Sequence, residues 1–142
     1  MLVLSSKVKY AVAALLELVN YSGKGLLQAK VIADRRSIPP NYLEQILNRF
    51  TRAGIVRAVR GSWGGYELAI YPANITFLMV WETMEGGTEI AGHETQESDA
   101  IQDLLREAEK EVKKIFSVAL ADLSARQQKY DYQMSENLMF HI

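Results

Sequence analysis

The chain has no cysteine among its 142 residues and only two histidines. The missing thiols exclude disulfides, thiolate nucleophiles, thiol redox sensing, and iron-sulphur or zinc sites made of cysteine alone. No apolar run reaches the roughly 18 residues that a membrane span needs, and the first residues lack a secretory signal. We therefore expect a cytoplasmic protein without a membrane segment.

Catalytic signatures are missing as well. The sequence contains no phosphate-binding loop motif and no glycine-rich dinucleotide fingerprint between a strand and a helix. His93 is the only histidine in its loop, and such a residue is more typical of a surface than of a metal site. These absences predict a protein that is not an enzyme and that holds neither a metal nor a cofactor.

Charge is divided unevenly between the two halves of the chain. Residues 1–70 hold 10 Lys and Arg against 4 Asp and Glu, whereas residues 71–142 hold 6 against 13. A basic half joined to an acidic half indicates a nucleic-acid-facing end and a separate body. Solvated helices can carry the same imbalance, so the charge pattern supports this interpretation without deciding it.

Residues 40–52 predict the helix around which the rest of the chain is organised. Pro40 stands at a first-turn position, where its missing N–H costs nothing, and Gly54 follows the end of the helix. One side of this helix is apolar, formed by Leu43, Ile46, Leu47 and Phe50. The other side is hydrogen-bonding and basic, formed by Asn41, Glu44, Gln45, Asn48, Arg49 and Arg52. Such a surface suits the edges of DNA bases.

A basic hairpin follows this helix. Residues 55–59 and 66–70 alternate as two strands, joined by a six-residue tip made of Arg60, Gly61, Ser62, Trp63, Gly64 and Gly65. A helix followed by such a hairpin predicts a winged helix-turn-helix, with the helix in a DNA major groove. Arg60 and its neighbours would then reach a minor groove or the phosphates. We expect Trp63 to contact DNA sugar, to insert in a groove, or to fold back on the wing.

Two further helices precede the recognition helix. The first spans residues 5–21 and is capped by Ser5 or Ser6, with Lys7 in its first turn. A cation there opposes the helix dipole, so an anionic partner explains Lys7 better than helix stability does, although simple solvation is the alternative. The second helix covers residues 28–36, and its turn into residue 40 completes a helix-turn-helix pair.

The second half predicts an amphipathic helix over residues 75–85, a loop over 86–97, and one long helix over 98–126. At about 1.5 Å per residue this last helix measures roughly 43 Å, so it should project beyond a compact body of this size. Its apolar side therefore requires a partner, and we expect the same helix of a second subunit. The expected dimerisation residues are Ile101, Leu104, Leu105, Ala108, Val112, Ile115, Phe116, Leu120 and Leu123.

The sequence thus predicts a mainly α fold with a small β-hairpin, in which a winged helix-turn-helix domain is joined to a long dimerisation helix. The expected divisions are a DNA-binding domain over residues 1–85, a loop over 86–97, and the long helix with a C-terminal tail over 98–142. The tail is apolar enough to pack against something, but the pattern does not indicate what.

Four strings of the sequence resemble the Rrf-two family of bacterial transcription regulators. They are LSSKVKYAVAALLEL, YLEQIL, RAGIVRAVRG and GGYELA, and together they extend the resemblance over roughly residues 3–86. The family includes an iron-sulphur cluster regulator and a cysteine-metabolism repressor. The resemblance implies a homodimeric winged helix-turn-helix repressor or activator, bound to double-stranded DNA at a partly palindromic operator.

The same resemblance implies roles for individual residues. Asn41, Tyr42, Glu44 and Gln45 match the start of the family's recognition helix, although Tyr42 could instead pack the helix start and Glu44 could pair within the helix. Arg60 matches the wing arginine of the minor groove, and Ser6 and Lys7 match positions near phosphate. The complete set expected at DNA is Ser6, Lys7, Asn41, Tyr42, Glu44, Gln45, Arg49, Arg60, Gly61, Ser62 and Trp63.

This chain departs from the family at several points. Many members carry three cluster-binding cysteines in the loop that matches residues 86–97, and this chain has none. Sensing through thiolates is therefore excluded. Sensing is then either lost in this chain or carried by a regulatory protein partner or a small effector. Ser37 also replaces the glycine that is usual in the turn. The alternative from another class is a winged-helix module whose main partner is a protein rather than DNA.

Overall fold

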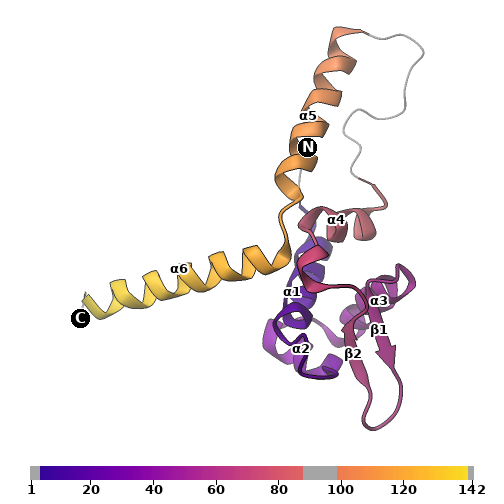
Figure 1. Ribbon diagram of the computed structural model, residues 1–142, viewed down its shortest axis with the longest axis vertical. Helices are drawn as coiled ribbons and strands as arrows, with labels where there is room; N and C mark the ends of the chain where they lie inside the picture. Colours follow the sequence, from indigo (N-terminus) through magenta and orange to yellow (C-terminus); the bar gives the residue numbers. More distant parts are fainter. Residues whose placement is uncertain (1–3, 88–98, 141–142) are drawn as a thin grey trace.

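A computed structural model describes residues 4–87 and 99–140, and it places a helical body at the base of two projecting helices (Figure 1). The helices are α1 (Ser6–Asn20), α2 (Ala29–Arg36), α3 (Pro40–Arg52), α4 (Phe77–Glu85), α5 (Ala100–Phe116) and α6 (Leu120–Phe140), with a short 3₁₀ turn at Pro72–Asn74. The strands β1 (Val56–Val59) and β2 (Gly65–Leu68) form the one hairpin of the described ranges. The predicted fold class, mainly α with a small hairpin, is confirmed.

Side-chain caps determine where several helices begin. The hydroxyl of Ser5 accepts from the backbone N–H of Val8 at 3.4 Å and starts α1. Thr76 caps α4 in the same way, and the carboxylate of Asp99 accepts from the N–H of Gln102 at 2.8 Å to start α5. Each cap satisfies a backbone donor that the first turn leaves without a partner.

One hydrophobic core holds the four helices α1, α2, α3 and α4 together with the first turns of α6. Its largest fully buried side chains are Phe50, Leu15, Ile32, Leu43, Ile46, Leu47, Ile75 and Leu120. The apolar side predicted for α3 is therefore the side that faces this core. Burial of that side leaves the opposite, polar side of α3 for solvent or a ligand.

The hairpin is attached to the body by backbone hydrogen bonds. Strands β1 and β2 are antiparallel, with Val56 opposite Leu68 and Val59 opposite Gly65. Leu27 forms an isolated bridge with Tyr66, in which Tyr66 donates to Leu27 at 2.8 Å and Leu27 to Tyr66 at 2.9 Å. The segment between α1 and α2 therefore supports the base of the wing.

The single long helix expected over residues 98–126 is wrong. The helix stops at Phe116, and a new helix begins at Leu120 and continues through most of the unassigned tail. Figure 1 shows α5 and α6 leaving the body in different directions. Ser117 donates its hydroxyl to the carbonyl of Lys113 at 2.6 Å, which satisfies one of the last carbonyls of α5.

Contacts with a distant segment cause the break. Phe77 donates its N–H to the carbonyl of Val118 at 3.0 Å, Leu120 donates to Ile75 at 2.8 Å, and Thr76 forms a β-bridge with Ala119. These bonds take backbone groups that a continuous helix would use internally. The connection between α5 and α6 is therefore set by the start of α4. Within residues 4–87 and 99–140, no helix is long and apolar enough to cross a membrane.

Candidate nucleic-acid interface

The helix-turn-helix pair consists of α2 and α3. The turn passes through Ser37, which adopts the left-handed conformation with φ 53° and ψ 43°, and the N–H of Ile38 returns to the carbonyl of Ala33 at 3.1 Å. Ser37 is the one non-glycine residue with positive φ in the part of the chain that the structure describes. Side chains are costly in this conformation, which explains why glycine suits the position better.

The start of α3 presents the predicted reading surface. Asn41, Glu44 and Gln45 are exposed, because Leu43, Ile46 and Leu47 take the side that faces the core. Tyr42 is half-buried, and its ring meets the edge of the Tyr10 ring at a centroid distance of 5.6 Å. Tyr42 therefore packs at the start of α3 in the absence of DNA, as one of its two interpretations expected.

Arg49 has a partner within the chain. Its Nη1 donates to the carbonyl of Met84 at 2.6 Å, so the guanidinium lies at the C-terminal end of α4. A cation is favourable there because the last carbonyls of a helix carry partial negative charge. Sequence reasoning missed this contact, since the two residues lie on separate elements and α4 shows no signal for an external partner.

The wing carries two exposed arginines, and one of them is paired. Arg57 forms an ion pair with Glu67 across the two strands, whereas Arg60 is exposed at the start of the tip. Gly61 has φ +113°, and a side chain at Gly64 would collide with the carbonyl oxygen of Val59. These two glycines therefore allow the tip to turn tightly.

Trp63 stands out at the wing tip. Its side chain is 94% exposed, so it does not fold back on the wing. Ser62 beside it is also exposed. A large aromatic ring at the end of a hairpin, with almost its whole surface in water, is suited to contact a ligand.

The start of α1 lies beside the end of α4. Ser6 is exposed and Lys7 is half-buried, while Ser5 donates its hydroxyl to Oε1 of Glu85 at 2.7 Å. This bond joins the first turn of α1 to the last turn of α4. The positions expected near phosphate are therefore held in place by α4.

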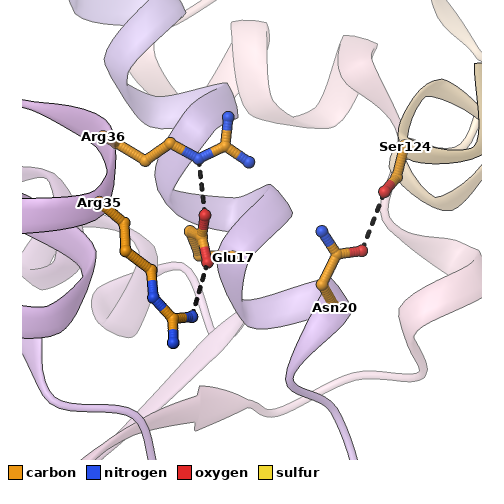
Figure 2. A network of polar contacts seen from close by, with 5 residues as sticks. All are labelled: Glu17, Asn20, Arg35, Arg36 and Ser124. Carbon is orange, nitrogen blue, oxygen red and sulfur yellow. Dashed lines mark hydrogen bonds and ion pairs between the residues drawn. The ribbon is translucent and has the colours of Figure 1, made fainter. Parts of the chain in front are cut away.

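Arg35 and Arg36 have an internal role (Figure 2). Arg36 Nε lies 2.7 Å from Oε1 of Glu17, and Arg35 Nη1 lies 3.3 Å from Oε2 of the same carboxylate. Nearby, Ser124 donates its hydroxyl to Oδ1 of Asn20 at 2.9 Å. The first contacts hold α2 against α1, and the second holds the base of α6 against the same helix. These residues line an open hollow of about 850 Å³ together with Arg126, Tyr130 and Asp131.

Eight of the nine expected dimerisation residues are exposed or half-buried. Ile101, Leu104 and Ile115 are exposed apolar residues on α5, and Ala108 is also exposed, while Leu105 and Val112 are half-buried. Phe116 is half-buried, with ring centroids 4.8 Å from Phe77 and 4.9 Å from Trp81, and Leu123 packs partly against the core. No buried residue lies on α5.

Leu120 corrects one of these expectations. Its side chain is fully buried in the core of its own chain, so it cannot face a second subunit in this fold. At residue 120 the apolar spacing that continues from α5 therefore packs against the core of the same chain.

Metal binding finds no support in the described residues, because they contain no group of three or more His, Cys, Asp and Glu side chains that could hold an ion. His93 lies outside the described residues, as does most of the loop over 86–97.

Comparison with known proteins agrees with this arrangement. The sequence matches the Rrf2 family, described as iron-dependent transcriptional regulator, over residues 4–126. It is 32% identical to the HTH-type transcriptional regulator CymR of Bacillus subtilis over 142 residues, covering 98% of this chain and 99% of that protein.

Solved structures give the same result. The structure of CymR, the global cysteine regulator of B. subtilis, is similar with a TM-score of 0.78 and 31% identity, over 89% of this chain and 98% of that one. The structure of T. potens IscR has a TM-score of 0.75 and 28% identity, over 91% of this chain and 90% of that one. The relatives are regulators, which confirms the expectation that this chain is not an enzyme. The chain therefore belongs to the Rrf2 family of transcriptional regulators.

Proposed function

We propose that this chain is a sequence-specific DNA-binding regulator that acts as a cytoplasmic homodimer on a partly palindromic operator, without an iron-sulphur cluster. The observation that carries the proposal is the exposed polar start of α3, with Asn41, Glu44 and Gln45, on a scaffold that also presents the basic wing. Recognition helices contact base edges chiefly through their N-terminal residues.

Each element has a distinct part in this proposal. Asn41 and Gln45 carry amides that can pair with adenine, and Glu44 can accept from the amino group of cytosine. Arg60 and Trp63 at the wing reach the minor groove or its sugars, while Ser6 and Lys7 hold phosphate. Arg57 adds little net charge, because Glu67 already pairs with it.

The apolar side of α5 supports the homodimer. Ile101, Leu105, Ala108, Val112 and Ile115 follow one another at spacings of four and three residues, which is the pattern of a coiled-coil seam. None of these five side chains is buried within the chain, and three of them are exposed. A two-fold partner would cover it and would place two recognition helices at half-sites about one helical turn of DNA apart.

The absence of cysteine supports the cluster-free part. The family description names iron, but this chain offers no thiolate to iron. We propose that the signal comes instead from a regulatory protein or a small effector, and that the bound dimer acts as a repressor.

The test is a binding measurement on selected DNA. A duplex is enriched with the full chain from a randomised 30-base-pair library, and its affinity is compared with that of a scrambled duplex by fluorescence anisotropy at several salt concentrations. A preference of at least about a thousandfold is expected. A dimer that neutralises about eight phosphates should give a log-log salt slope near −7. Failure to bind any duplex at low salt would favour the protein-interaction module instead.

A further inference from the structure

The last turn of α4 is tied to two of the three elements that are expected to meet DNA, α3 and the start of α1. Arg49 of α3 donates to the carbonyl of Met84 at 2.6 Å, and Ser5 before α1 donates to the carboxylate of Glu85 at 2.7 Å. Met84 itself is buried, so its carbonyl belongs to a turn that the core holds in place. Gly86 then ends the helix in the left-handed conformation, with its N–H bonded to the carbonyl of Glu82 at 2.8 Å.

The hydrogen bond from Arg49 to Met84 holds α3 on a side that does not face the core. Ile46 and Phe50 are buried and hold one face of α3 against the body. Arg49 lies beside Phe50 but is itself exposed, and its contact with α4 restrains the flank of the helix. Restraint on a face and on a flank together limits rotation of α3 about its own axis.

The position of Arg49 along α3 also argues against base contact. It follows Pro40 by nine residues, which corresponds to about 13 Å along the axis, whereas base contacts come chiefly from the first turns. A charge-assisted hydrogen bond to a helix C-terminus is among the stronger polar contacts in proteins. The guanidinium is therefore already engaged before any DNA arrives.

We propose that Arg49 is a positioning residue, which sets the orientation of the recognition helix through the end of α4 and does not contact DNA. The inference rests on the proposed function, because it concerns how α3 reads an operator. Base readout requires side chains placed to within about half an ångström, whereas attraction to phosphate tolerates larger displacements. Loss of the contact should therefore reduce specific binding more than non-specific binding.

The experiment compares Arg49→Gln with the unaltered chain on the selected and scrambled duplexes, over a series of salt concentrations. Affinity for the selected duplex is expected to fall about tenfold, the size of a lost hydrogen bond to a charged group. Affinity for the scrambled duplex and the salt slope should stay unchanged. Lys7→Ala is the matched control. Removal of one phosphate contact makes the log-log salt slope less negative by about 0.9 on both duplexes.

Three results would overturn the inference. A salt slope that becomes less negative by about 0.9 in Arg49→Gln would make Arg49 a phosphate contact. An unchanged ratio of the two affinities would mean that Arg49 has no part in positioning. No preference in the unaltered chain would overturn the proposed function and this inference together. Thermal melting and stoichiometric titration with the selected duplex correct for unfolded protein. If the glutamine variant does not fold, Arg49→Lys, which keeps a cation, replaces it and should give an intermediate ratio of the two affinities.

Discussion

Leu120 donates its backbone N–H to the carbonyl of Ile75 at 2.8 Å, and the side chains of both residues are fully buried. The first residue of α6 is therefore part of the same core as α1 and α4. The C-terminal part of the chain is anchored in the winged helix-turn-helix body and not merely appended to it.

Leu120→Ala should lower the free energy of unfolding by about 2–5 kcal/mol, because it removes buried methyl groups and leaves a cavity. Urea denaturation followed by circular dichroism measures the change. Tyr71→Ala is the control, since this side chain is 71% exposed and its loss should change stability by less than about 0.5 kcal/mol. Equal effects of the two substitutions would contradict the placement of Leu120.

The proposed seam on α5 predicts the outcome of a paired charge substitution. Ile101→Glu with Ile115→Glu should weaken the dimer at least about a hundredfold, since two apolar side chains would lose their burial. Both positions are exposed in the single chain, so the helix itself should still form. Sedimentation equilibrium reports the association.

Lys110→Glu provides a control of equal charge change on the opposite side of α5. Lys110 is exposed and lies about 180° around the helix from Ile101. The control should leave the association intact. If both variants dissociate to the same extent, net charge rather than the seam governs the dimer.

Ser37→Gly should stabilise the fold by about 0.5–1 kcal/mol. Glycine removes the strain of a side chain at φ 53°, and this gain exceeds the cost of a more flexible unfolded chain. Ser22→Gly tests the cost of the more flexible unfolded chain alone, since Ser22 does not have positive φ. This substitution should destabilise the fold by about 0.4–1 kcal/mol. A loss of stability in Ser37→Gly would contradict the strain.

Trp63 can report its own contact with DNA. The chain has two tryptophans, and Trp81 packs against Phe116, so Trp81→Phe leaves Trp63 as the single indole. Addition of the selected duplex should then change the emission of Trp63.

Trp63→Ala should weaken DNA binding by about tenfold, the size expected when a large apolar side chain loses its burial in the groove, and leave the melting temperature unchanged because the ring is exposed. Unaltered emission together with unaltered affinity would show that Trp63 stays in water. An affinity loss accompanied by a lower melting temperature would assign Trp63 a structural part instead.

Local chemistry determined the winged helix-turn-helix half. Pro40 and the apolar spacing of Leu43 to Phe50 identify α3, since both act within one or two turns of chain. The glycine-bearing tip between two alternating segments identifies the hairpin for the same reason. The expected polar side of α3 also followed directly, because burial of one helix face exposes the other.

Tertiary structure decided what local patterns could not express. Apolar spacing continues from Ile115 through Leu123, so it predicts one helix, yet the backbone at residues 118–120 bonds to residues 75–77 and breaks it. Likewise the arginine pattern on α3 suits DNA, but the carbonyl of Met84 lies within reach of Arg49 only once α4 has packed beside it. Periodicity reports which face of a helix is apolar; which partner covers that face, and which carbonyl a long cation reaches, depends on residues far away in the sequence.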